Sequence, residues 1–349
     1  MRGITVWSRV RGWTAVTGVL AVVLLTAAAC RADPPTAAAS RTPTNAPATT
    51  APATTAPATT APATTAPASS VPAFTGPVVA LGDSYTAGGL LPLTPAAKPP
   101  GCLRSTKAYP VLVAQALHAQ LTDVACTNAG VKEMTGPQKT YLGTNPAQLS
   151  ALKPADRLVL LSLGGDDLGF LNVLQECMKV SVAAPSGSPC KAHYTAGGTD
   201  QLAASVTTEA AKIAQVLTAI RERAPRARVV VVGYPDMFPQ SGGCWPSVPI
   251  ATGDVAYLRG IEVSANAMLA TDAAAAGDTF VNTYSPTTGH DFCQQEPVRD
   301  VEGLLPGSLS LPFHPNARGQ AAMAAAVLAA VGRYPTRYLH PASNSHARD

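Results

Sequence analysis

The part of the sequence with a globular pattern lacks any charge imbalance. The chain has 349 residues and a formal net charge of +4, and charged residues make up only 13% of it. The first 73 residues hold five of the 25 basic residues and one of the 21 acidic residues, so residues 74–349 hold 20 of each. Recognition of nucleic acid needs a basic face or stripe. Nucleic acid is therefore excluded as an expected partner.

The cysteines lack the C-x-x-C spacing that is typical of zinc sites. The sequence therefore predicts no metal, and nothing in it indicates an organic cofactor. Seven cysteines are present, and six of them follow Cys30. An even number in an exported chain predicts three disulfides in an oxidising compartment, although the count alone leaves the pairing open.

The N-terminus carries an apolar run that is too interrupted for a permanent membrane span. Three arginines precede residues 13–29, and threonines and a glycine break the run. This pattern predicts a signal peptide over residues 1–29. Small residues lead into Cys30, as in a bacterial lipoprotein cleavage site, although Ala27 stands where leucine is usual. Lipidation at Cys30 is the first hypothesis, release after ordinary cleavage the second, and an uncleaved anchor the third.

Large apolar side chains are missing between Asp33 and Ser70. Ala-Pro-Ala-Thr-Thr occurs four times in succession from Ala46. Such a segment cannot bury enough surface to offset its ordering entropy, and its prolines favour extended stretches. We predict a disordered spacer over residues 30–73, a folded domain over 74–334 and a solvated tail over 335–349.

The predicted domain alternates strand and helix signals. Continuous apolar runs, typical of strands buried on both faces, lie at Pro77–Leu81, Thr122–Cys126, Leu158–Leu163, Arg228–Gly233 and Thr279–Asn282. A helical pattern covers 202–220, and a final helix is expected over 316–331. The alternation predicts a three-layer α/β/α fold with its chemistry at the carboxyl ends of the strands. Residues 90–106, 179–198 and 236–253 are expected to form loops beside a cleft.

Two motifs could supply a nucleophile and its base. Gly82, Asp83 and Ser84 directly follow the first strand, where a serine hydroxyl would be exposed at the sheet edge beside a helix N-terminus. The alternative is that Asp83 or Ser84 only caps a helix. His314 precedes the last helix, and a neutral imidazole there could take the serine proton and return it to a leaving group.

These motifs, together with Gly164-Gly165-Asp166-Asp167, resemble the SGNH/GDSL hydrolase superfamily over about residues 76–333. The likeness is to its secreted bacterial esterase and lipase branch with three disulfides. It implies a flavodoxin-like sheet of about five parallel strands and hydrolysis of esters through Ser84 and His314. The implied disulfides are Cys102–Cys126, Cys177–Cys190 and Cys244–Cys293.

The sequence departs from this family beside the histidine. Many members have an aspartate three residues before it, and Leu311 stands there in this chain. A backbone carbonyl can also hold the imidazole in the required tautomer. We predict a Ser84–His314 dyad with the Leu311 carbonyl as orienter. Asp291 or Asp300 is the alternative.

A second departure concerns the oxyanion hole, where Asp166 replaces the family's asparagine. An ionised aspartate accepts hydrogen bonds but donates none. Asp166 could be protonated and act at acidic pH, or it could turn away, or the enzyme could be weak or inactive. Backbone N–H groups of Ser84 and of Asn128, or alternatively Gly130, are expected to complete the hole.

The leading functional hypothesis is cleavage of carboxylic esters, in the manner of a lipase or esterase, by a monomer outside the cell or at its surface. The expected partner is an ester substrate, either a lipid or another acylated molecule. Contact with a membrane is expected only through a lipid anchor on Cys30. A polysaccharide acetyl esterase is the second hypothesis. A binding protein on the same scaffold is the rival, because of Asp166 and Leu311.

Overall fold

The computed structural model describes residues 74, 76–89, 92–94 and 101–332. The predicted signal peptide, Cys30, the spacer and the C-terminal tail lie outside the described residues, as does part of the 90–106 segment. The elements are β1 (Val78–Gly82), α1 (Ser84–Ala87), α2 (Tyr109–Ala116), β2 (Leu121–Asp123), α3 (Val131–Thr135), β3 (Gln138–Thr140), β4 (Gly143–Asn145), η1 (Gln148–Ala151), β5 (Leu158–Ser162), α4 (Phe170–Ser181), α5 (Pro189–Thr195), α6 (Gln201–Arg223), β6 (Arg228–Val232), α7 (Thr252–Ala275), β7 (Thr279–Val281), η2 (Ser285–Thr287) and α8 (Ala317–Gly332).

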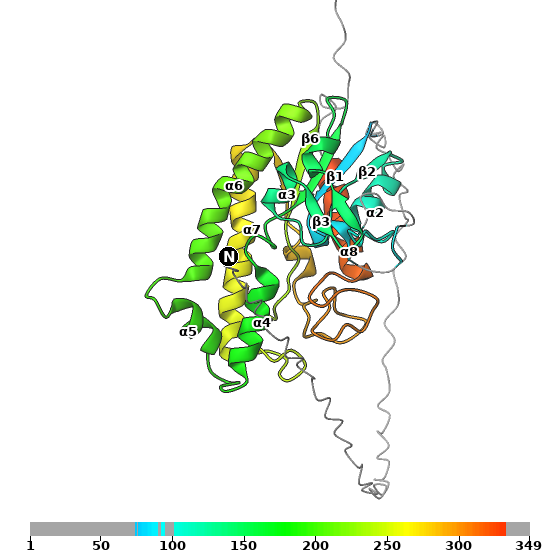
Figure 1. Ribbon diagram of the computed structural model, residues 1–349. Helices are drawn as coiled ribbons and strands as arrows, with labels where there is room; N and C mark the ends of the chain where they lie inside the picture. Colours follow the sequence, from blue (N-terminus) through cyan, green and yellow to red (C-terminus); the bar gives the residue numbers. More distant parts are fainter. Residues whose placement is uncertain (1–73, 75, 90–91, 95–100, 333–349) are drawn as a thin grey trace, which may run out of the picture. The chain divides into compact units, whose positions relative to one another are not determined.

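The described residues fold around a five-stranded sheet with the order β2-β1-β5-β6-β7, and every pair in it is parallel. Each of the five apolar runs supplies one strand. The predicted three-layer α/β/α fold is therefore confirmed. Helices α6 and α7 pack against each other on one side of the sheet, and α2 and α8 do so on the other (Figure 1).

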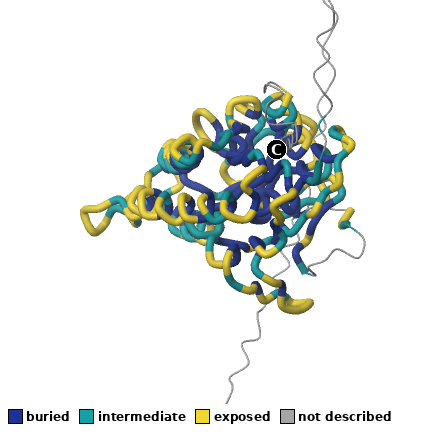
Figure 2. Tube along the Cα trace, turned by 90° about the horizontal axis from the view of Figure 1, so that it is seen from above, coloured by how far each residue is buried: buried dark blue, intermediate teal, exposed yellow. Residues whose placement is uncertain are grey.

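Alternate residues of each strand enter two separate cores, because successive strand side chains point to opposite faces. Val79 and Leu81 of β1 join the core under α6 and α7, whereas Val78 joins the core under α2 and α8. Both faces of the sheet are thus covered, which explains why the strands are continuously apolar. Figure 2 shows the buried residues gathered in the interior, with exposed residues along the outer helices and loops.

The expectation of a loop over residues 179–198 is wrong in part. Helix α4 continues to Ser181, and α5 begins at Pro189. The Asp254 carboxylate on α7 accepts hydrogen bonds from the backbone N–H groups of Cys190 (2.8 Å) and Lys191 (2.9 Å). A cap supplied from a distant helix leaves no local signal in the sequence. The antiparallel hairpin of β3 and β4 was likewise not predicted.

The six described cysteines form three disulfides, and their pairing is the one that the family resemblance implies. Cys102–Cys126 ties the segment before α2 to the loop that follows β2. Within the described ranges no helix combines the length and the hydropathy that a membrane span requires.

Candidate active site

Ser84 is the first residue of α1, directly after the carboxyl end of β1. The turn requires glycine at position 82, where φ is +132° and a Cβ atom would lie 2.1 Å from the carbonyl oxygen of Ser162. Asp83 caps the helix, since its Oδ1 accepts a hydrogen bond from the N–H of Tyr85 at 2.9 Å. Both readings of the motif therefore hold: Asp83 is the cap, and Ser84 is free to present its hydroxyl at the sheet edge.

The structure brings Ser84 and His314 together across 230 residues of chain. The distance between Ser84 Oγ and His314 Nε2 is 2.7 Å, and that between His314 Nδ1 and the carbonyl oxygen of Pro312 is also 2.7 Å. A carbonyl only accepts, so Nδ1 carries the proton and Nε2 is the acceptor for the serine hydroxyl. Burial lowers the pKa of His314, against the opposing effect of the Pro312 carbonyl. A neutral imidazole is therefore favoured, as a general base requires.

The prediction that the Leu311 carbonyl orients His314 is wrong by one residue. The carbonyl of Leu311 accepts the backbone N–H of His314 at 3.3 Å, and the next carbonyl, that of Pro312, faces the ring. The two alternative acids are bound elsewhere. Asp291 accepts hydrogen bonds from the N–H of Cys293 and the side chain of Gln294, and Asp300 pairs with Arg318.

The loop before α8 is held in place by a tyrosine from the serine helix. Tyr85 Oη donates to the carbonyl oxygen of Phe313 at 2.7 Å, and its ring centroid lies 5.1 Å from that of His314. Phe313 has φ of +59°, a conformation that bulky residues rarely adopt. Tyr85, the residue that follows Ser84, is thus hydrogen-bonded to Phe313, the strained residue that precedes His314.

A buried carboxylate, Glu302, organises the outer part of the same loop. It accepts hydrogen bonds from Gly307 N–H (2.9 Å), Ser308 Oγ (2.7 Å) and Asn316 Nδ2 (3.1 Å), and it pairs with Arg299. Although burial alone raises the pKa of Glu302, these donors and the Arg299 guanidinium hold it below its ordinary value. The ionised carboxylate therefore stabilises the segment that presents His314.

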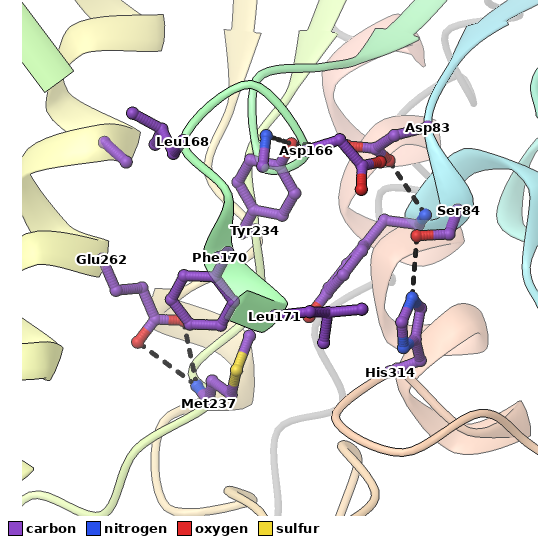
Figure 3. Close-up of a pocket in the computed structure, with 13 residues that line it drawn as sticks. Asp83, Ser84, Asp166, Leu168, Phe170, Leu171, Tyr234, Met237, Glu262 and His314 are labelled. Carbon is purple, nitrogen blue, oxygen red and sulfur yellow. Dashed lines mark hydrogen bonds between the residues drawn. The ribbon is translucent and has the colours of Figure 1, made fainter. Parts of the chain in front are cut away.

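Asp166 lies at the same pocket as Ser84 and His314, with Asp83 close by (Figure 3). Burial, together with Asp167 and Glu133, raises the pKa of Asp166 to about 6. Burial and the charge of Asp166 also raise the pKa of Asp83, although a hydrogen bond from Tyr234 opposes this. Two carboxyl groups thus crowd one desolvated site, where holding a proton between them is favourable.

The backbone donors predicted for the oxyanion hole differ in availability. The N–H of Gly130 donates to the Glu133 carboxylate at 2.9 Å, so it is occupied. The N–H groups of Ser84 and Asn128 make no hydrogen bond within the described part of the chain. Asn128 has φ of +62°, in a segment that the Cys126 N–H ties to the carbonyl oxygen of Gly82 at 3.0 Å. Neither Asn128 nor Gly130 is among the residues that line the pocket.

The pocket beside Ser84 is mostly apolar. Its lining includes Phe170 and Leu171 from the start of α4, Met237 after β6, and Ala265 of α7. Figure 3 shows Ser84 and His314 at one side of the pocket and Leu168, Phe170 and Glu262 at the other. A nucleophile, a neutral base and an apolar wall are what hydrolysis of a carboxylic ester with a hydrocarbon acyl group requires.

The sequence of the chain settles its family. Residues 80–322 match the GDSL-like lipase/acylhydrolase family. The chain belongs to this family. As a GDSL lipase/esterase it is a carboxylic ester hydrolase, and the predicted superfamily and type of activity are confirmed.

Streptomyces proteins are prominent among the relatives of this GDSL enzyme. Lipase 2 of Streptomyces coelicolor is 41% identical over 251 residues, which cover 70% of this chain and 82% of that protein. The crystal structure of phospholipase A1 from Streptomyces albidoflavus is 28% identical, with a TM-score of 0.61, and the match covers 73% of this chain and 98% of that one. The crystal structure of an extracellular lipase from Streptomyces rimosus is also 28% identical, with a TM-score of 0.60. That match covers 73% of this chain and 99% of the other.

Sequence reasoning missed two tyrosines and a glutamate of this GDSL site. Tyr234 Oη donates to Asp83 Oδ2 at 2.6 Å and accepts the N–H of Gly165 at 2.7 Å, which joins three strand ends. Its place two residues after β6, at the carboxyl edge of the sheet, could have drawn attention to it. Tyr85 and Glu262 sit within helices and left no comparable signal.

Proposed function

We propose that this chain hydrolyses lipid acyl esters outside the cell through a Ser84–His314 dyad. Ser84 Oγ attacks the ester carbonyl carbon while His314 Nε2 takes the hydroxyl proton. The tetrahedral intermediate collapses to an acyl-serine, and the imidazolium gives its proton to the departing alcohol. Water, deprotonated by the same nitrogen, then attacks the acyl-serine, and the acid and the free serine are released.

The observation that carries this proposal is the pair of 2.7 Å contacts made by the two nitrogens of His314. The Pro312 carbonyl fixes the tautomer, and the serine hydroxyl is within proton-transfer distance of the free lone pair. The lowered pKa of His314 keeps this lone pair available below neutral pH.

In this proposal the N–H groups of Ser84 and Asn128 and the protonated carboxyl of Asp166 stabilise the oxyanion. A neutral carboxylic acid donates a hydrogen bond, whereas the ionised form repels the developing charge. Because the pKa of Asp166 is raised to about 6, the donor is present in mildly acidic solution and is lost as the pH rises through that value. The hole is thus complete only at acidic pH.

A lipid substrate is favoured over an acetylated polysaccharide because the pocket wall beside Ser84 is hydrocarbon. Relatives that bear the names lipase and phospholipase A1 support the same class. Three disulfides favour an oxidising compartment outside the cytoplasm. Lipidation at Cys30, with release after ordinary cleavage as the alternative, is part of this proposal.

Hydrolysis of p-nitrophenyl butyrate between pH 4 and 8 tests the proposal. The wild-type chain should release nitrophenol with a maximum on the acidic side of neutrality, and Ser84→Ala should reduce the rate to background throughout. Equal rates for the two proteins would overturn the assignment of Ser84.

A further inference from the structure

A second apolar cavity lies behind the pocket that contains Ser84. The two share four residues of their lining, Leu168, Phe170, Glu262 and Ala265. Figure 3 shows three of them, Leu168, Phe170 and Glu262, on the side of the pocket away from Ser84 and His314. The second cavity therefore begins where the first ends.

The second cavity extends between three helices. Val173 comes from α4, Leu202 and Ser205 from α6, and Leu258 and Ile261 from α7. On α7, residues 258, 261, 262 and 265 follow the spacing of one helix face. Leu258 lies four residues before Glu262, which corresponds to about 6 Å along the helix axis, so the lined path continues beyond the first pocket.

The carboxyl group on this path, that of Glu262, is turned away from it. Both carboxylate oxygens of Glu262 accept the backbone N–H of Met237, at 3.1 and 3.4 Å, so they face the chain after β6. Burial, with Asp236 close by, raises the pKa of Glu262 well above its ordinary value. A carboxyl group that is hydrogen-bonded to the backbone, away from the path, presents little obstacle to a hydrocarbon chain.

We infer that the second cavity binds the distal methylenes of a long acyl chain, and that Leu168 and Phe170 form the partition which the chain passes. This inference rests on the proposed function and specifies its substrate as esters of medium-chain and long-chain fatty acids. Both partition residues are partly exposed side chains, which can change rotamer without opening the closed core. Short acyl groups occupy the first pocket alone.

Ser205 offers a way to fill the second cavity without touching the first. It is an exposed residue of α6 that lines the second cavity, and its hydroxyl donates to the carbonyl oxygen of Gln201 at 2.8 Å. Thr207 is a matched control, because it is also exposed on α6, it makes the same bond to Ala203 at 3.1 Å, and it lines neither cavity. Ser205→Phe and Thr207→Phe therefore add the same ring to the same helix on different sides.

The experiment measures kcat/KM for p-nitrophenyl esters from acetate to laurate below their critical micelle concentrations. A buried methylene contributes about fourfold to binding, so several should make the wild-type value on decanoate at least about tenfold higher than on butyrate. Ser205→Phe should remove this gain and leave acetate and butyrate rates unchanged, while Thr207→Phe keeps the wild-type profile. Unchanged rates on the short esters also show that the variant is folded.

Two results would overturn the inference. One is a wild-type profile that stops rising at butyrate, and the other is a Ser205→Phe profile that equals that of Thr207→Phe. In either case hydrolysis that still depends on Ser84 leaves the proposed function standing. Hydrolysis that persists in Ser84→Ala would instead remove the proposed function itself.

Discussion

The two halves of this active site are built on different principles. The proton-transfer half consists of Ser84, His314 and the Pro312 carbonyl, joined by two 2.7 Å contacts that need no charged group. The oxyanion half contains Asp166, a carboxyl group whose usefulness depends on its proton. In the proposed mechanism, the first half works over a broad pH range above the pKa of His314, whereas the second half restricts activity to acidic conditions.

Removal of the base should have the largest effect. His314→Ala leaves the hydroxyl of Ser84 without a proton acceptor, so kcat/KM for p-nitrophenyl butyrate should fall about 10³-fold or more at pH 6. Steady-state kinetics check this, with circular dichroism to confirm the fold. A residual rate within tenfold of wild type would mean that the proton-transfer half has been misassigned.

Repair of the oxyanion half should raise activity. Asp166→Asn supplies an amide donor at every pH, whereas the carboxyl group with a pKa of about 6 is only about 1% protonated at pH 8. We therefore expect a gain of about 10²-fold in kcat at pH 8 and near parity at pH 5. A pH–rate profile of both proteins measures this. A variant slower than wild type at pH 8 would contradict the role given to Asp166.

Loss of the link between the two motifs should have a moderate effect. Tyr85→Phe removes the hydroxyl that donates to the Phe313 carbonyl. A bond of this kind is worth about 1 kcal/mol, so kcat should fall about fivefold with KM nearly unchanged, because Tyr85 positions His314 through its loop. An altered KM with the wild-type kcat would assign the hydroxyl to substrate binding instead.

The smallest effect should follow from restoring the acid that many family members carry. The single proton of Nδ1 in neutral His314 already donates to the Pro312 carbonyl, so Leu311→Asp should change kcat/KM within about twofold at pH 7. Leu311→Asn serves as the uncharged control of similar size. A gain of tenfold for the aspartate alone would show that the carbonyl is an inadequate orienter.

Much of this fold could be predicted because its signals are local. Five continuous apolar runs specify strands buried on both faces, and a parallel sheet brings their carboxyl ends to one edge. Ser84 and His314 could be named because each stands at such an edge or just before a helix. The disulfide pairing came from the family resemblance, since the cysteine spacings alone leave it open.

The features that the sequence did not predict depend on local backbone conformation and on contacts between residues far apart in the chain. Which carbonyl accepts the Nδ1 proton of His314, that of Leu311 or that of Pro312, depends on the left-handed conformation of Phe313. A phenylalanine before a histidine does not predict this conformation. The start of α5 depends on Asp254, more than sixty residues away. The choice between the N–H groups of Asn128 and Gly130 as oxyanion donor was also open in the sequence. The structure shows that the Gly130 N–H is already bonded to the Glu133 carboxylate.

Covalent trapping tests the central claim most directly. The account predicts that a fluorophosphonate probe modifies the wild-type chain, that peptide mass spectrometry locates the adduct on Ser84, and that Ser84→Ala takes up none. His314→Ala should label far more slowly, since the hydroxyl has lost its base. Absence of labelling at every pH from 4 to 8, or an adduct on another residue, would contradict the account.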